Sequence, residues 1–248
     1  SLLKIVSKSM IYPILMIGEW RFMTVSNFKR EYLDYLFPQR TRLETEYALT
    51  KESPQEDIDD AVNKMIRKDY EMVQDYLPTS CDSVLDIGCG LALSDVALYN
   101  HYKDNYNKRS EIYLLDKNEF DTTKISGFNK EYKGYNSMDA AKDILVSNGV
   151  EESKINLYET DSFDELYDKK YDIISSFLSC GWHYDVSTYM DLFEKTLSDD
   201  GILILDIRHD TGQVETVKSK FNLHRQIYNH AESKHTGGNI GDRYIFTR

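Results

Sequence analysis

The stretch Val84-Leu85-Asp86-Ile87-Gly88-Cys89-Gly90 is the segment around which the rest of the predicted fold is arranged. Its apolar half, residues 84–87, is typical of a parallel strand that is covered on both faces. Gly88 and Gly90 then allow a tight turn and let the backbone approach a ligand without interference from a Cβ atom. Residues 91–99 predict a helix. A strand, a glycine turn and a helix in this order hold nucleotide-like ligands in α/β proteins.

Apolar runs that end in polar or acidic residues recur along the chain and leave room for helices between them. They predict further strands at residues 111–116, 154–158, 171–177, 202–208, 223–228 and 243–247. Further helices are expected at residues 137–147, 186–197 and 213–221. Parallel strands joined by right-handed crossovers bring the loops after their carboxyl ends to one edge of the sheet. The sequence therefore predicts an α/β fold with its candidate functional residues at that edge.

Residues 1–80 precede this alternation and predict an N-terminal helical extension, whereas residues 81–248 form the expected ligand-binding domain. Ser53-Pro54-Gln55-Glu56 is typical of a helix start, with Ser53 as the N-cap residue and an apolar stripe following it. An earlier helix is expected over residues 28–37, ending before a proline. The extension contains no motif that indicates a ligand.

The charge of the chain limits the partners that it can bind. The formal net charge is -12 and the sequence contains no strong basic run, which argues against unaided binding to nucleic acid or to an anionic membrane. Arg40 and Arg42 could meet an anionic acceptor group, or they could be solvated surface charges. We therefore expect no nucleic-acid partner and no membrane partner.

The cysteines and the apolar runs indicate the compartment. Cys81, Cys89 and Cys180 cannot all pair with one another and show no C-x-x-C spacing, so free thiols in a reducing cytosol are expected. The most apolar early run, residues 10–18, is too short to span a bilayer and is interrupted by Pro13. With 248 residues and 41% hydrophobic residues, the chain can bury a sizeable core. The sequence thus favours a cytoplasmic protein.

The glycine turn resembles motif I of the class I S-adenosylmethionine (SAM)-dependent methyltransferases, an acidic residue followed by x-Gly-x-Gly-x-Gly. The chain keeps Asp86, Gly88 and Gly90 and has Ala92 where the third glycine often stands. The resemblance extends over residues 81–248 by element order. It implies a Rossmann-like seven-stranded, mostly parallel sheet with a C-terminal antiparallel hairpin, and SAM as the cofactor. The implied cofactor-binding residues at this turn are Asp86, Gly88, Cys89 and Gly90.

Two further acidic residues match positions that bind the cofactor in this family. Asp116 ends a predicted strand, where its two carboxylate oxygens can accept hydrogen bonds from both ribose hydroxyls, or it could simply cap the loop. Asp161 matches the acid that commonly binds the adenine amino group, although it could equally be an N-cap for residues 163–167. The same strand ends add the other cofactor-binding predictions: Lys117, Ser162, Phe163, Ser176 and Phe177.

The loop over residues 178–185 contains the most reactive side chains of the sequence. His183 could take a proton from an acceptor hydroxyl, because its reference pKa of about 6.5 lies close to physiological pH. His183 and Trp182 could instead pack over the cofactor without acid-base work. His209, which follows the strand at residues 202–208, is the second candidate base. Many amino-group methyltransferases of this family contain the motif Asn-Pro-Pro-Tyr or Asp-Pro-Pro-Tyr, and the sequence contains neither. This absence favours an oxygen acceptor over a nitrogen acceptor.

The predicted function is therefore SAM-dependent methylation of a small molecule, with O-methylation of a hydroxylated, sugar-like acceptor and a histidine base. The segment Trp182-His183-Tyr184 loosely resembles bacterial small-molecule and sugar O-methyltransferases. The alternatives are a non-catalytic partner subunit with the same fold and a small-molecule N-methyltransferase. A nicotinamide dehydrogenase is disfavoured because the turn lacks the third glycine of G-x-G-x-x-G. No metal site is expected, and residues 117–136 could form a lid or a solvated insertion.

Overall fold

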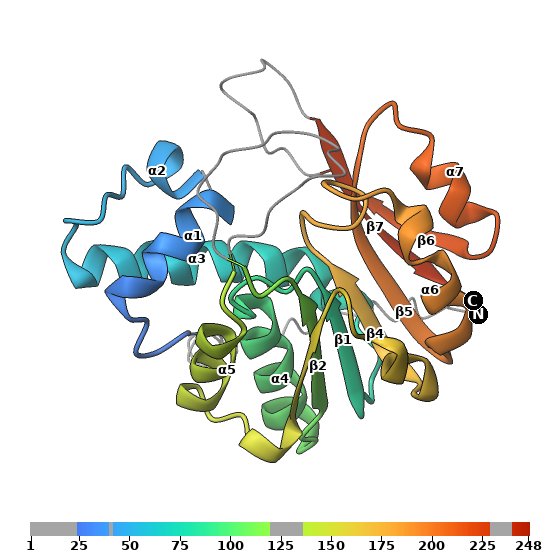
Figure 1. Cartoon of the computed structure of the whole chain (residues 1–248), viewed down its shortest axis with the longest axis horizontal. Helices are drawn as coiled ribbons and strands as arrows, with labels where there is room; N and C mark the ends of the chain where they lie inside the picture. The colour runs from blue at the N-terminus through green and yellow to red at the C-terminus, as the bar shows by residue number, and fades with distance from the viewer. Residues whose placement is uncertain (1–23, 40–41, 120–135, 229–239) are drawn as a thin grey trace, which may run out of the picture.

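The computed structural model describes residues 24–39, 42–119, 136–228 and 240–248. Within these ranges seven strands form one sheet in the order β3-β2-β1-β4-β5-β7-β6 (Figure 1). The five parallel strands are β1 (Ser83–Ile87), β2 (Glu111–Asp116), β3 (Ile155–Glu159), β4 (Tyr171–Ser176) and β5 (Leu197–Arg208). β7 (Gly241–Thr247) is antiparallel to both β5 and β6 (Asn222–Ile227). The predicted seven-stranded sheet with an antiparallel C-terminal pair is confirmed.

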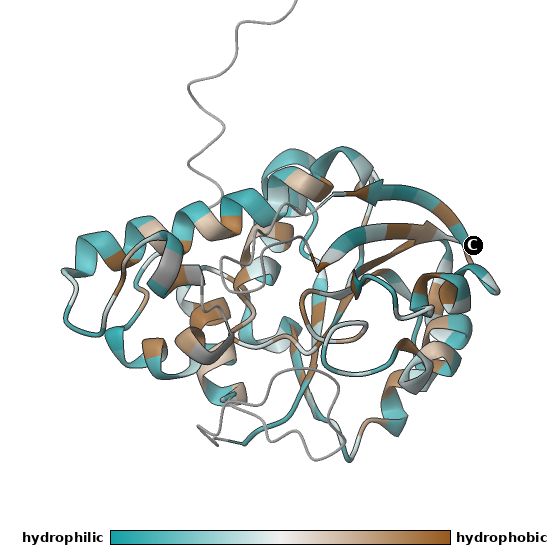
Figure 2. Cartoon of the chain, turned by 90° about the horizontal axis from the view of Figure 1, so that it is seen from above, coloured by the Kyte–Doolittle hydropathy of each residue, from teal (hydrophilic) through white to brown (hydrophobic). Residues whose placement is uncertain are grey.

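Helices cover both faces of the sheet. One face packs against α3 (Gln55–Val73), α4 (Leu93–Tyr106) and α5 (Met138–Ser147). The other face packs against η5 (Asp164–Asp168), α6 (Met190–Thr196) and α7 (Gln213–Lys218). Figure 2 shows hydrophobic residues gathered where the helices meet the sheet and hydrophilic residues on the outer sides of the helices. The molecule therefore has three layers, with the sheet in the middle.

The strand sequences explain how one sheet serves two cores. Successive side chains of a strand point to opposite faces. Accordingly, Val84 and Ile173 belong to the core beneath α3 and α4, whereas their neighbours Leu85 and Ile174 belong to the core beneath α6. All four side chains are fully buried. Apolar residues at consecutive positions, which the sequence shows in each parallel strand, are thus required on both sides.

The N-terminal helices join the first of these cores. Leu33 and Leu36 of α1 (Leu33–Gln39) and Ile58 of α3 are buried in the same cluster as the residues of α4. α2 (Arg42–Glu46) follows α1. Shorter 3-10 turns complete the described elements: η2 (Arg30–Tyr32), η3 (Gln74–Tyr76), η4 (Glu152–Lys154) and η6 (Val186–Thr188). No helix in the described ranges is long and apolar enough to cross a membrane.

Several predicted boundaries are wrong. Ser53 does not cap α3, because its Oγ accepts a hydrogen bond from the amide of Thr50 (2.9 Å) and Pro54 occupies the cap position. The helix predicted over residues 28–37 begins as a 3-10 turn and continues to Gln39. β5 starts at Leu197, five residues early, because Leu197 pairs with Tyr171 before a bulge in the strand. Residues 10–18, Arg40 and most of the predicted 117–136 loop lie outside the described residues.

The parallel strands place the candidate residues at one edge. The carboxyl ends of β1 to β5 all meet at the upper edge of the sheet in Figure 1. The neighbours of β1 in the sheet are β2 on one side and β4 on the other, so the chain order reverses direction across β1. Ligands of open α/β sheets bind at such a topological switch point. The glycine turn therefore lies where this kind of fold binds its ligand.

Candidate functional site

The glycine turn after β1 adopts backbone conformations that favour glycine. Gly88 has a φ of 72° and Gly90 a φ of 53°, both in the left-handed region. Ala92 has a φ of 54°, so the residue that replaces the third glycine of the motif still adopts the glycine-like conformation. A Cβ atom on Gly88 would overlap the side chain of Ser179, which follows β4. Glycine is thus needed at Gly88 for conformation and for space.

Asp116, the predicted ribose acid, is already bonded to this turn. Its Oδ2 atom accepts a hydrogen bond from the amide of Gly90, and its Oδ1 atom accepts one from the amide of Lys117, both at 2.7 Å. Burial raises the pKa of Asp116 to about 6, although the two amide donors act in the opposite direction. Asp116 therefore caps the loop, which was one of the two predicted roles. It also lies against the glycine turn, the position that the other predicted role, ribose binding, requires.

A group of carboxyl groups lies beneath the turn. Asp86 is buried in β1 and accepts a hydrogen bond from the hydroxyl of Ser175 (3.1 Å). Asp95, in the first turn of α4, is fully buried. Burial, and then the carboxyl groups of Asp116, Asp86 and Asp95, raise the pKa of the Cys89 thiol well above its usual value. Cys89 is therefore a buried neutral thiol, and this side of the site is electrostatically negative.

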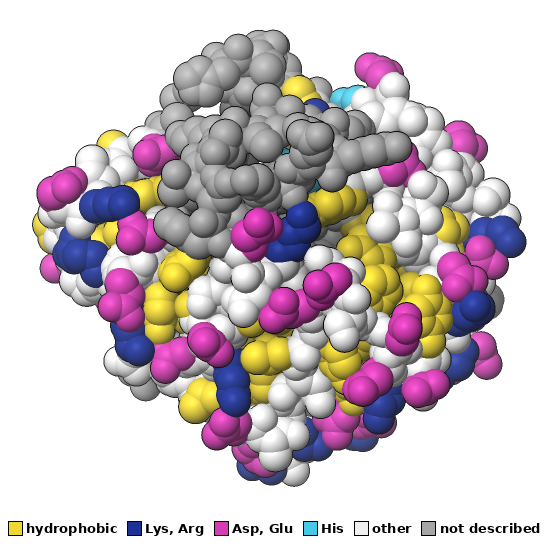
Figure 3. Space-filling model, in the orientation of Figure 1, with side chains coloured by type: hydrophobic (Ala, Val, Ile, Leu, Met, Phe, Trp, Pro, Cys, Tyr) yellow, Lys and Arg dark blue, Asp and Glu magenta, His cyan; other side chains and the backbone are white. Residues whose placement is uncertain are grey.

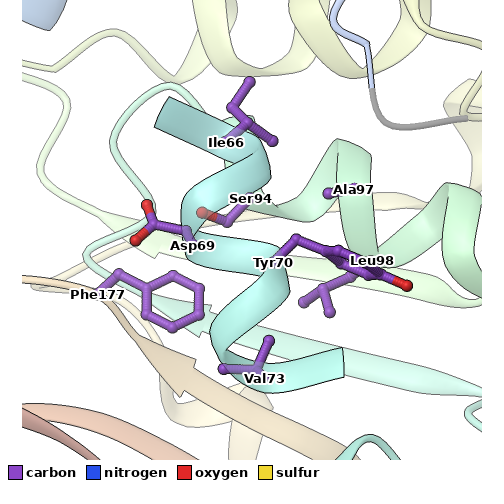
Figure 4. Close-up of a pocket in the computed structure, with 8 residues that line it drawn as sticks. All are labelled: Ile66, Asp69, Tyr70, Val73, Ser94, Ala97, Leu98 and Phe177. Carbon is purple, nitrogen blue, oxygen red and sulfur yellow. The ribbon is translucent and has the colours of Figure 1, made fainter. Parts of the chain in front are cut away.

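Ser176 and Phe177, which end β4, use their side chains within the protein. The Ser176 hydroxyl donates to the carbonyl of Ile87 (2.6 Å) and accepts from the amide of Cys180 (2.8 Å). The ring of Phe177 lies 4.1 Å from the guanidinium carbon of Arg243. If Ser176 and Phe177 bind the cofactor as predicted, they would do so through their backbone atoms. A small apolar pocket, with room for roughly one water molecule, lies beside Phe177 between α3 and α4 (Figure 4).

The loop after β4 forms a compact turn above Gly88. The carbonyl of Ser179 accepts hydrogen bonds from the amides of Trp182 (3.0 Å), His183 (2.7 Å) and Tyr184 (3.2 Å). Because Ser179 also abuts Gly88, this turn fixes the Trp182-His183-Tyr184 segment above the glycine turn. The sequence prediction that this loop lies at the ligand edge agrees with its position.

The two candidate bases have different surroundings. Burial, and then the positive charge of Arg208, lower the pKa of His183 to about 4. His209 has a side chain that is 33% exposed, and its Nε2 atom lies 2.9 Å from Oδ2 of the buried Asp242. The same carboxylate oxygen accepts a hydrogen bond from Nε2 of the Gln226 side chain (2.8 Å). Both rings are half-buried: His183 is neutral because its pKa is lowered, whereas His209 is held by a carboxylate.

Asp161 and Ser162 are exposed where β3 ends, and Phe163 is half-buried beside Tyr189. The alternative that Asp161 caps a helix is wrong, because η5 begins at Asp164 and has no side-chain cap. Asp161 thus remains available at the ligand edge. Cys81, Cys89 and Cys180 are free, as predicted, and the structure shows all three buried. In the described ranges no group of three His, Cys, Asp or Glu residues could hold a metal ion.

A buried ion network that the sequence analysis missed lies behind the site. Arg243 of β7 is fully buried and makes two hydrogen bonds to Asp206 of β5, from Nε (2.8 Å) and from Nη2 (2.9 Å). Nη2 of Arg243 also lies 3.1 Å from Oδ1 of Asp69 in α3. Asp206 in turn accepts a hydrogen bond from the amide of Leu178 (3.2 Å). The network connects α3, the sheet and the loop after β4.

The fold is similar to that of solved methyltransferases. StiE O-MT, residues 961–1257, is 14% identical with a TM-score of 0.52, over 83% of this chain and 81% of that chain. A methyltransferase from Pyrococcus furiosus is 12% identical with a TM-score of 0.47, over 88% of this chain and 98% of that chain. A TehB-like SAM-dependent methyltransferase from Corynebacterium glutamicum is 14% identical with a TM-score of 0.42, over 72% and 85%.

The sequence itself matches no protein-family model, and it matches no curated protein. Identities of this size show the fold alone. The strand order, the two helical layers and the antiparallel last pair of strands agree with that similarity. The chain therefore has the Rossmann-like fold of the SAM-dependent methyltransferases.

Proposed function

We propose that the protein is a SAM-dependent methyltransferase that acts on a small molecule. The observation that carries the proposal is the hydrogen bond between Asp116 and Gly90, which joins the acid after β2 to the glycine turn after β1. A nucleoside bound at this switch point would place its ribose beside the Asp116 carboxylate. Asp161, exposed after the neighbouring β3, is the proposed partner of the adenine amino group.

The charges around the turn support a cationic cofactor. SAM carries a positive sulfonium and a positive ammonium group, which a site containing Asp86, Asp95 and Asp116 would attract. The cofactor supplies an already activated methyl group. The protein must then align an acceptor lone pair with the sulfur–methyl bond and exclude water. Trp182 and Tyr184, on the turn above Gly88, are the proposed cover over that reaction space.

We propose a hydroxyl acceptor of sugar-like character and His209 as its general base. A base is effective when it is free to take a proton near neutral pH and its protonated form is stabilised. The Asp242 carboxylate, 2.9 Å from Nε2, is placed to hold the His209 ring in one orientation. His183, with its pKa lowered to about 4, is neutral but a weaker base, so we propose that it lines the acceptor site.

The formal net charge of -12 favours a small acceptor over a polyanion. Figure 3 shows Asp and Glu side chains spread over the visible face, with Lys and Arg side chains between them. A phosphate backbone or an anionic membrane would require a continuous basic patch. We therefore propose a small-molecule acceptor with neither nucleic acid nor membrane as a partner.

The test is methyl transfer from methyl-labelled SAM to a panel of sugars, phenols and amines, with S-adenosylhomocysteine measured as the second product. The proposal predicts labelled product with hydroxylated compounds and none with Asp116→Ala at the same cofactor concentration. Label on amines alone would make the protein an N-methyltransferase. SAM binding without product on any acceptor would contradict catalysis and favour a non-catalytic subunit.

A further inference from the structure

Asp95 is a buried acid without an evident structural role. It lies in the first turn of α4, directly after the glycine turn, and its side chain is fully buried. Neither of its carboxyl oxygens accepts a hydrogen bond from a donor in the described part of the chain. A buried carboxylate without a donor is strongly destabilising, so an uncharged form of Asp95 is favoured.

The group that Asp95 faces is another carboxyl group. Asp86 lies within hydrogen-bonding reach, and two ionised carboxylates at this separation in a buried site repel each other. One proton between them converts the contact of two acceptors into a hydrogen bond. The hydroxyl of Ser175 also donates a hydrogen bond to Oδ1 of Asp86. The full burial of Asp95, the lack of a donor to its oxygens in the described residues and the neighbouring Asp86 carboxyl group thus favour a pair that holds one proton.

None of the charged groups described next replaces that proton as a positive charge beside the Asp86–Asp95 pair. Burial, and then Asp86, raise the pKa of Asp95 well above its usual value. For the next acid, Asp116, the charge of Asp86 raises the pKa and the charge of Lys117 lowers it. The fully buried Arg243 of β7 is bonded to Asp206 and to Asp69 of α3. The Cys89 thiol is neutral.

We propose that Asp95 is a positioning residue for the cofactor: it shares one proton with Asp86 in the free protein, and the pair releases that proton when a cationic ligand binds at the glycine turn. This inference rests on the proposed function, since SAM supplies the positive charge. The carboxyl O–H bond breaks, its electron pair stays on the carboxylate, and the proton passes to water and then to the buffer. The ionised pair then faces the ligand's cationic groups, while Asp95 keeps Asp86 in place beneath the turn.

The shared proton can be tested without any cofactor. Infrared difference spectra of wild type minus Asp95→Asn at neutral pH should show the carbonyl band of a protonated carboxylic acid. Asn keeps the shape of Asp and can donate to Asp86, so the fold should survive, as circular dichroism would verify. Asp164→Asn, at an exposed acid of η5, is the matched control and should leave the band intact. Absence of the band from wild type would overturn the shared proton.

The release step requires SAM. Calorimetric titrations in two buffers of different ionisation enthalpy give the number of protons released on binding. We expect wild type to release about one proton more than Asp95→Asn, while Asp164→Asn, at an exposed acid of η5, releases as many protons as wild type. The titration of the SAM ammonium group cancels in these differences. Equal release by wild type and Asp95→Asn would overturn the release step. No binding of SAM by any variant would contradict the proposed function and the release, whereas the infrared band still decides the shared proton.

Discussion

Oδ2 of Asp116 lies 2.7 Å from the amide nitrogen of Gly90, so the acid after β2 and the turn after β1 are joined by a hydrogen bond. The two residues come from neighbouring parallel strands, β2 and β1, whose carboxyl ends lie side by side. This bond holds the carboxylate at the ligand edge. It also means that a change of Asp116 affects the turn as well as the ribose site.

Asp116→Ala should weaken SAM binding. Each charge-assisted hydrogen bond to a ribose hydroxyl contributes roughly 1.5 kcal/mol or more, so the loss of two should raise the dissociation constant about a hundredfold. Calorimetry measures the effect, and Asp164→Ala, an exposed acid in η5, is the matched control. An unchanged dissociation constant in a folded Asp116→Ala protein would mean that the ribose binds elsewhere.

The same carboxyl group should make SAM binding depend on pH. Asp116 must be ionised to accept two hydroxyl donors, and its pKa is raised by burial to about 6. Affinity should therefore rise as the pH increases through about 6. Between about pH 5 and 6 wild type should gain up to about tenfold more affinity per pH unit than Asp116→Asn. Parallel pH profiles for the two proteins would contradict this assignment.

His209→Ala should lower the turnover number by about a hundredfold to ten-thousandfold, while SAM affinity stays nearly unchanged. Asp242→Asn should lower turnover less, because it removes the carboxylate that holds the ring but leaves the base in place. His183→Ala should mainly change the Michaelis constant for the acceptor. The measurement is turnover and SAM dissociation constant on the same preparations. Full activity in His209→Ala with a collapse in His183→Ala would transfer the role to His183.

Arg243→Met should lower the free energy of unfolding by about 3 to 5 kcal/mol, because it leaves the buried Asp206 carboxylate without its counter-charge. Arg109→Met is the matched control, since Arg109 forms an exposed ion pair with Glu151 that contributes under about 1 kcal/mol. Urea denaturation measures both. Losses of equal size in the two variants would show that the Arg243 network contributes no more than a surface pair.

The sequence predicted the central parallel strands β1, β2, β4 and β5 because they are buried on both faces and are therefore apolar at consecutive positions. It also predicted Asp116 at the glycine turn, because the position of an acid at the end of a strand follows from the strand itself. The start of β5 could not be predicted, since Leu197 joins the strand through its pairing with Tyr171, a contact made in the folded sheet. Local sequence patterns do not contain such pairings.

The buried ionic groups were missed for a related reason. Arg243 bonds to Asp206 and Asp69, which lie far away in the sequence, so no local spacing indicates the network. A weaker signal was present. Asp206 stands inside the apolar run of β5, and Asp95 stands inside the apolar start of α4. A charged residue within a buried element requires a partner of opposite charge or a proton, so the pattern indicates a buried polar interaction at both positions.

The proposed cofactor can be tested by calorimetric titration of the purified protein with SAM, S-adenosylhomocysteine and NAD. The glycine turn with Asp116 bonded to Gly90 predicts that SAM or S-adenosylhomocysteine binds and that NAD does not. Binding of NAD at micromolar concentration, with no binding of SAM at millimolar concentration, corresponds to a preference of more than about 4 kcal/mol for the wrong cofactor. That result would contradict the methyltransferase proposal.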